Sequence, residues 1–311
     1  MAQGGNEMLD QLVTTYLEVR RALGFDLDET ERMLRQYVAF AEALGDTHIL
    51  TNTALDWCAE AGTAGQRHHR LRRVVLFARY ARAEDPLHEV PPGDIFPRLP
   101  PQRMPYIYTP EEAAKLIAAA EQLGPAGSLR PHTVATIIGL LFATGMRVSE
   151  ALALHLDDIT NDGIVIRKTK FRKSRFIPLH DTAQKRLQQY IDLRIRAGTP
   201  PNHIFINYHG KPLGHRGLNG SFRKARRTIG LERPVDQSQP RVHDIRHTFA
   251  VRALEACPDG RDRIAQHMLA LTTYLGHTNV ADTYWYLRAT PKLMRDIADL
   301  CETTFRKGVR S

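Results

Sequence analysis

Basic side chains suited to phosphate chemistry occur in three short segments of the second half of the chain. ATGMRVSEAL places Arg147 after a glycine turn, at an expected helix start where backbone N–H groups and a guanidinium can face one anion. HDIRH places His243 and Arg246 three residues apart, on one face of a helix. YLGH ends at His277, and Tyr286 follows nine residues later. Together the arginines and histidines could converge on one anionic ligand such as a phosphate.

A fourth segment is predicted to form a basic β-hairpin. The runs GIVIRKT (residues 163–169) and RFIPL (residues 175–179) are rich in β-branched and apolar residues, and a short basic stretch separates them. This pattern places Lys170, Arg172 and Lys173 at the turn. Each of the four segments is weak evidence by itself, because a Gly-Arg pair at a helix start and an isolated His-x-x-Arg both occur often by chance.

The charge of the chain indicates an acidic partner. Its 311 residues carry 43 Lys and Arg against 34 Asp and Glu, a formal net charge of +9. Nucleic acid is the first candidate partner for a basic protein of this size. The three cysteines lie far apart and form no CxxC pair, which excludes a zinc ribbon or a disulfide framework as the organising feature.

One segment of the otherwise acidic N-terminal part is strongly basic. The first 100 residues hold 11 Arg, no Lys and 15 acidic residues, yet residues 61–83 contain no carboxylate. Such a segment predicts a helix face that contacts the phosphates of a nucleic acid. The alternative is a basic helix that only increases solubility. Its arginines are Arg67, Arg70, Arg72, Arg73, Arg79 and Arg82.

Two domains must position these groups. Apolar residues at helical spacing predict a small helical bundle over the first ~85 residues. Seven prolines within residues 86–105 predict a stiff linker, and Thr109-Pro-Glu-Glu is typical of a new helix start. We therefore expect a helical domain over residues 1–90, a proline-rich linker over 91–105 and a second domain over 106–311. The fold class is then mainly α with a small β-sheet, that is, an α+β second domain.

In combination and in this order, the four segments resemble the tyrosine recombinase (phage integrase) family. The resemblance covers residues 106–310 by motif, and the N-terminal bundle looks like the family's core-binding domain. It implies a C-shaped clamp on DNA and six catalytic positions: Arg147, Lys170, His243, Arg246, His277 and the nucleophile Tyr286. Glu150 matches an acidic position that orients the basic groups. Lys168, Arg172 and Lys173 would contact the DNA backbone, as would Arg67, Arg70, Arg72 and Arg73.

Two assignments within this resemblance have alternatives. Tyr284 and Tyr286 point about 200° apart on a helix, so only one can face the phosphate; the spacing from LGH favours Tyr286. The pattern KFRKSRFIPL favours Lys170 as the catalytic lysine, with Lys173 as second choice. The chain also departs from compact members of the family, because Arg246 and His277 lie 31 positions apart.

The resemblance implies site-specific cutting and rejoining of DNA through a 3′-phosphotyrosine, as in integration, excision or transposition, and a mobile-element recombinase is the favoured setting. No metal, cofactor or ATP is expected. The expected partners are double-stranded DNA with an inverted-repeat core site and three further copies in a tetramer on synapsed DNA, with or without partner recombinases. An apolar stripe predicts a C-terminal helix at about residues 291–307. The helix either packs on its own domain or, as the resemblance implies and as we favour, is exchanged with a neighbouring copy.

Other functions are open at this point. The chain could be an accessory DNA-binding protein on the same scaffold, a topoisomerase-like enzyme that cleaves without exchange, or a metal-dependent phosphohydrolase of the His-Asp type. The first residues, MAQGGNEMLDQ, lack the apolar segment of a secretory signal, and no segment is long enough to span a bilayer. We therefore expect a cytoplasmic, nucleoid-associated protein.

Overall fold

The computed structural model describes residues 6–25, 27–96, 103–167, 174–198, 202–234, 237–256 and 261–276. The chain divides into two compact units, residues 1–102 and 103–311, and the division falls within the proline-rich segment. Within the described ranges, no helix is both long and apolar enough to cross a membrane.

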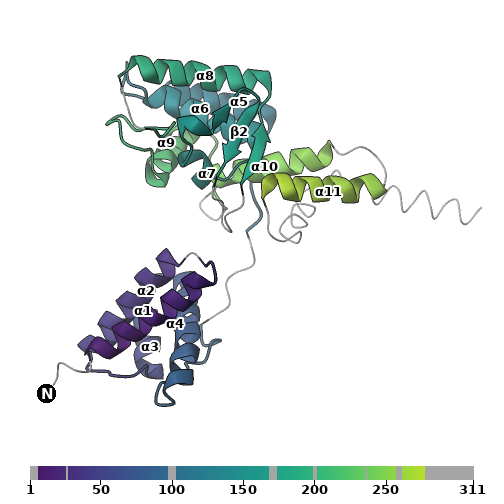
Figure 1. Ribbon diagram of the computed structural model, residues 1–311. Helices are drawn as coiled ribbons and strands as arrows, with labels where there is room; N and C mark the ends of the chain where they lie inside the picture. Colours follow the sequence, from purple (N-terminus) through teal and green to yellow (C-terminus); the bar gives the residue numbers. More distant parts are fainter. Residues whose placement is uncertain are drawn as a thin grey trace, which may run out of the picture. The chain divides into compact units, whose positions relative to one another are not determined.

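Unit 1 is a helical bundle of α1 (Asn6–Ala22), α2 (Asp28–Ala43), α3 (Thr51–Ala59) and α4 (Ala64–Glu84) (Figure 1). Each helix has an apolar face that it buries against the others, because an amphipathic helix is stable only when that face is covered. The buried side chains include Val13, Tyr37, Trp57 and Phe77. At the start of α4, Thr63 accepts a hydrogen bond from the backbone N–H of Gln66, which satisfies one of the free donors at that end.

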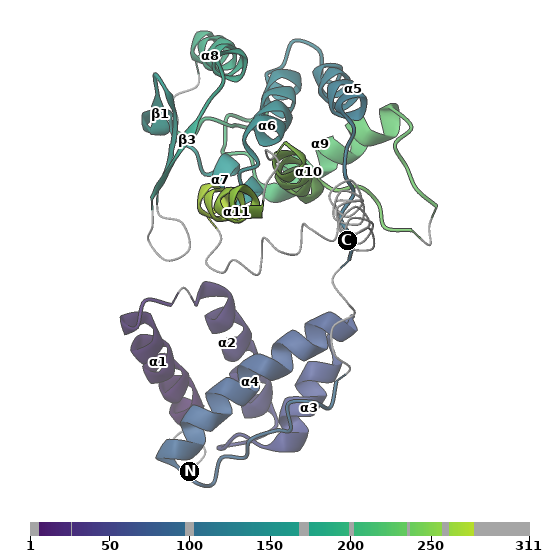
Figure 2. The ribbon, with the colours of Figure 1, turned by 90° about the vertical axis from the view of Figure 1, so that its right-hand side faces the viewer.

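Unit 2 is mostly helical and is built around α6 (Arg130–Thr144), which lies between α5 (Pro110–Glu121) and α8 (Asp181–Arg196) (Figure 2). Ten of the fifteen residues of α6 are buried, as its largely apolar sequence predicts. The N-terminus of α5 is closed by a capping box between Thr109 and Glu112. The remaining helices are α7 (Val148–Leu152), the short 3₁₀ turn η1 (Leu156–Asp158), α9 (His215–Thr228), α10 (Val242–Glu255) and α11 (Arg261–Leu275).

A small antiparallel sheet accompanies these helices. Its strands are β1 (Ile159–Thr160), β2 (Gly163–Ile166) and β3 (Arg175–Pro178), in the order β1-β2-β3. Ile164 pairs with Ile177, and both side chains are fully buried. The prediction of a mainly α fold with a small β-sheet is confirmed. The predicted turn residues Lys170, Arg172 and Lys173 lie outside the described residues, as do the predicted DNA contact Lys168 and the predicted exchange helix.

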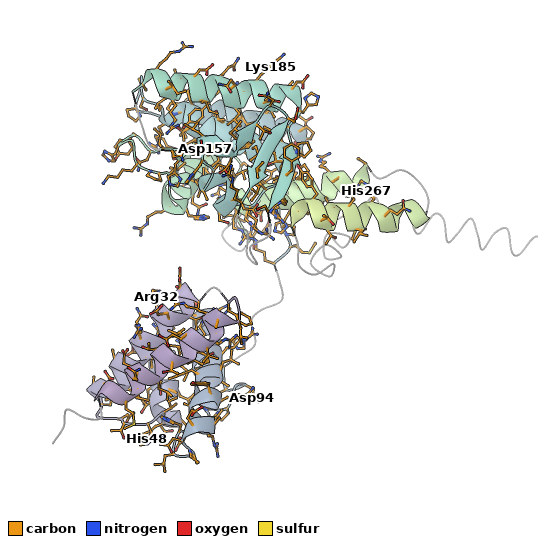
Figure 3. The ribbon with its side chains drawn as sticks, viewed as in Figure 1. Arg32, His48, Asp94, Asp157, Lys185 and His267 are labelled. Carbon is orange, nitrogen blue, oxygen red and sulfur yellow. The ribbon has the colours of Figure 1, made fainter. Side chains whose placement is uncertain are left out.

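Helices α10 and α11 lie side by side and form a second core of unit 2 (Figure 1). Val251 and Leu254 of α10 pack in it with Leu271 and Leu275 of α11. The ring of His267, labelled in Figure 3, donates from Nε2 to the carbonyl oxygen of Ala253, 2.7 Å away. This packing fixes the last turn of α11 beside the helix that carries the His-x-x-Arg segment.

Candidate active site

Arg147 stands at the junction of two helices. Gly145 ends α6 in the left-handed conformation, with φ 61°, and the chain turns directly into α7, for which Arg147 is the N-cap residue. The backbone N–H of Arg147 donates to Glu150 Oε2 at 2.8 Å, and its Nη1 donates to Oε1 at 2.9 Å. Its Nη2 donates to the carbonyl oxygen of Gly276 at 2.8 Å. The guanidinium is thus held in place while a third of the side chain stays exposed.

Arg246 occupies a more enclosed position on α10. Its side chain is buried, Nη1 donates to the carbonyl oxygen of Gly145 at 2.9 Å, and Nη2 donates to that of Leu275 at 2.7 Å. Arg246 therefore joins the end of α6 to the end of α11. Because Arg147 bonds to the next residue, Gly276, the two arginines meet at the same turn although 99 positions separate them in the sequence.

His243 lies one turn before Arg246 on the same helix, as the spacing predicts. The residue keeps part of its surface exposed to solvent, and the protein covers the rest. Loss of hydration beside the protein, together with the positive charges of Arg246, Arg241 and Arg147, lowers the pKa of His243 below its usual 6.5. The imidazole is therefore neutral at pH 7, the form that can accept a proton.

Glu150 is the acidic group of the cluster. Its side chain is almost fully buried, and burial alone would raise its pKa, but hydrogen bonds from Arg175 and Arg147 outweigh that effect and lower the pKa below 4.5. The carboxylate is therefore ionised at neutral pH and pairs with two guanidinium groups, those of Arg147 and Arg175, so the three groups together keep one positive charge.

Comparisons with known proteins show which family the chain belongs to. A profile described as the phage integrase family matches residues 107–292. The integrase/recombinase y4rB of Sinorhizobium fredii is 38% identical over 298 residues, which cover 92% of this chain and 94% of that protein. The chain belongs to the phage integrase family. It is a tyrosine recombinase, and the resemblance drawn from the four segments is confirmed.

Further relatives and structures agree with this assignment. The tyrosine recombinase XerD of Halalkalibacterium halodurans is 30% identical over 200 residues, covering 63% of this chain and 61% of that one. The integrase of the Tn1549 transposon, in complex with transposon right-end DNA, has the same fold with a TM-score of 0.63, at 18% identity and coverage of 90% and 94%. The XerH recombinase bound to its difH substrate gives a TM-score of 0.62 at 17% identity, with coverage of 87% and 78%.

The structure brings together one part of the site predicted from the sequence. Arg147 and Arg246 both donate hydrogen bonds to the turn at the end of α11. Glu150 accepts from Arg147, and His243 lies close enough to both arginines for their charges to lower its pKa. Lys170, His277 and Tyr286 lie outside the described residues, so their predicted roles stay predictions. Within the described ranges, no three His, Cys, Asp or Glu side chains gather as a metal site would require.

Arg175 of the recombinase was not predicted as a site residue. It begins β3 and pairs with Glu150 through two hydrogen bonds, Nη1 to Oε1 at 2.9 Å and Nη2 to Oε2 at 2.6 Å. The sequence shows this arginine in the segment KFRKSRFIPL, where the spacing indicates a strand but no partner 25 residues away.

The arginines of unit 1 that are predicted to contact DNA differ in their exposure and in the hydrogen bonds that they already make. Arg72 is exposed on α4. Arg70 donates to the carbonyl oxygen of Trp57 at 2.7 Å, and its guanidinium lies 4.5 Å from the centre of that ring. Arg67 donates to the carbonyl oxygen of Ala61 at 2.9 Å, and Arg73 is half-buried. Arg79 and Arg82, further along α4, are exposed.

Proposed function

We propose that this recombinase cuts and rejoins double-stranded DNA at a specific site, with Tyr286 as the nucleophile. The observation that supports this proposal most directly is that Arg147 and Arg246, from α7 and α10, both bond to the turn that directly precedes His277. Two permanently charged guanidinium groups beside that turn suit the extra negative charge of a phosphate under attack. Two of the five side-chain N–H groups of Arg147 donate hydrogen bonds to acceptors among the described residues.

Each remaining group has a role in the proposed reaction. The Tyr286 oxygen attacks the scissile phosphorus, a 3′-phosphotyrosine forms, and the bond to the 5′ oxygen breaks. His243, neutral because its pKa is lowered, accepts the tyrosine proton. Lys170 delivers a proton to the departing 5′ oxygen, and His277 donates a hydrogen bond to the phosphate. A 5′-hydroxyl of another strand then attacks the phosphotyrosine, which reverses the step and joins the new strand.

The wider assembly belongs to the same proposal. Four copies would act on two synapsed duplexes with inverted-repeat core sites, each copy exchanging the segment at about residues 291–307 with a neighbour. Unit 1 would be the core-binding domain, and Arg72, exposed on α4, would contact the DNA backbone. Transposition or integration of a mobile element is the proposed biological setting, which would place the protein at the nucleoid.

The test is a search for a covalent protein–DNA adduct. End-labelled DNA spanning the flanks of the gene is incubated with wild type, Tyr286→Phe or Tyr284→Phe in the presence of EDTA, and the products are denatured in SDS. We expect a protease-sensitive adduct with wild type and Tyr284→Phe only. Loss with Tyr284→Phe alone would transfer the nucleophile to Tyr284. Tight DNA binding without any adduct would favour an accessory role, and joining of two different duplexes separates recombination from topoisomerase-like cleavage.

A further inference from the structure

A buried ion pair connects β3 to α7. The side chains of Arg175 and Glu150 are 12% and 9% exposed, and the guanidinium binds both carboxylate oxygens. Glu150 also accepts the backbone N–H and Nη1 of Arg147. A carboxylate offers about four lone-pair directions, so these four donors fill its hydrogen-bonding capacity. Half of that capacity is supplied by Arg175.

The same guanidinium lies against the turn at the end of α11. A Cβ added to Gly276 would lie 2.8 Å from Arg175 Nη1 and 3.2 Å from its Cζ, so the two residues are in close contact. The carbonyl oxygen of Gly276 accepts a hydrogen bond from Arg147. Arg175 therefore meets both Glu150, which orients Arg147, and the residue that directly precedes His277.

We propose that Arg175 is a positioning residue for strand cleavage: it holds the Glu150 carboxylate and the Gly276 turn so that the Arg147 guanidinium, which bonds to both, is correctly placed. This inference rests on the proposed function, because it assigns a role in that reaction. It deepens that function by adding a residue which acts through Glu150 and need not touch the DNA.

The chemistry of the pair explains why arginine occupies this position. Only a planar guanidinium donates two parallel hydrogen bonds to a carboxylate, and lysine can supply a single point charge. Removal of Arg175 would leave a buried carboxylate with half of its donors, which favours its protonated form. Arg147, at the start of α7, is a further charged group that faces Glu150. The Tyr274 hydroxyl of α11 lies within electrostatic range of Arg175 and of Arg246 from α10.

The first experiment follows the Glu150 carboxyl in the DNA-free full-length protein. Glutamate labelled with ¹³C at the side-chain carboxyl is titrated by NMR over about pH 5 to 8, and Glu150→Gln identifies the signal. We expect Glu150 to stay ionised throughout in wild type and in the control Arg196→Met, which removes an exposed arginine of α8. We expect it to titrate within the range in Arg175→Met and, less far, in Arg175→Lys. An unchanged ionised signal in both Arg175 variants would overturn the proposal.

The second experiment measures the rate of adduct formation at saturating protein, with the affinity for DNA measured separately. We expect Arg175→Met to slow the adduct on the order of 10²-fold, as misplacement of a catalytic group does, with DNA affinity near that of wild type. Arg175→Lys should recover part of the rate. If Arg175→Met folds poorly, the comparison of Arg175→Lys with wild type tests the proposal instead. A rate in Arg175→Met equal to that of Arg196→Met would refute the positioning role.

A double variant separates positioning from direct action on DNA. If Arg175 acts through Glu150, Glu150→Gln/Arg175→Met should be no slower than Glu150→Gln alone. Losses that multiply would show that Arg175 acts on the phosphate itself and would overturn the inference. Absence of any adduct from wild type would contradict the proposed function instead, and the NMR titration would still decide whether Arg175 holds Glu150 ionised.

Discussion

Gly145 offers the sharpest test of how the site is built. It ends α6 with φ 61°, its carbonyl oxygen accepts a hydrogen bond from Arg246, and Arg147 follows two residues later. A Cβ at this position would lie 2.4 Å from Cδ1, 2.6 Å from Cγ and 3.0 Å from Cβ of Phe249 on α10. Because the Cβ of Phe249 is attached to the backbone, the clash cannot be relieved by rotation of the ring alone.

The expected cost of Gly145→Ala has two parts. An L-residue in the left-handed region costs about 1–2 kcal/mol. Overpacking of a buried contact adds about 1–3 kcal/mol. The free energy of unfolding should therefore fall by about 2–5 kcal/mol. Gly230→Ala is the matched control, since Gly230 has φ 69° in the same unit and nothing within 4 Å of an added Cβ. It should lose only the first part.

Urea denaturation of the full-length chain, followed by circular dichroism, measures both variants. We expect Gly145→Ala to be the less stable variant by about 1–3 kcal/mol, the contribution of the Phe249 contact. Adduct formation should also slow in Gly145→Ala, because relief of the clash displaces the carbonyl that holds Arg246 and the start of α7. Equal losses of stability in the two variants would refute the argument that α6 and α10 meet this closely at the site.

Three further predictions concern separate parts of the molecule. Gly276→Ala combines φ 66° with a Cβ 2.8 Å from the guanidinium of Arg175, so adduct formation should slow, and an unchanged rate would contradict this contact. Arg72→Ala should weaken non-specific DNA binding and reduce the salt slope of that binding by about 1, without loss of stability. Arg70→Ala should instead lower the stability of unit 1, because the variant loses a hydrogen bond and a ring contact. Equal effects of the two variants in DNA binding and in thermal unfolding would contradict the different roles given to the two arginines. Burial, and after it the charge of a neighbouring histidine, lowers the pKa of His88 below 6.5. The contribution of His88 to stability is therefore complete above pH 6.5 and is lost as the pH falls through the folded-state pKa. His88→Gln should reduce this loss of stability at acid pH in thermal unfolding, and an unaltered pH profile would show that His88 does not cause it.

Much of the molecule follows from local sequence, because the relevant signals act over one or two turns. Helical spacing of apolar residues predicts the bundle of unit 1, and the caps around Thr109 predict the start of α5. His243 and Arg246 share a helix face because residues three apart must do so. The order of the four segments then indicates the family, which the comparisons confirm. The two-residue strand β1 is too short to give such a signal and was not predicted.

Other features exist only through tertiary structure. The pairing of Arg175 with Glu150 depends on where β3 passes α7, and no local pattern encodes that contact. The meeting of Arg147 and Arg246 at the end of α11 depends likewise on the packing of α6, α10 and α11. On α4 the sequence shows a run of arginines, but the position of Trp57 on α3 decides that Arg70 turns toward the bundle while Arg72 stays exposed. The sequence by itself determines residue type and helix face, whereas the packed fold decides which groups meet, because contacts across elements are set by the core that joins them.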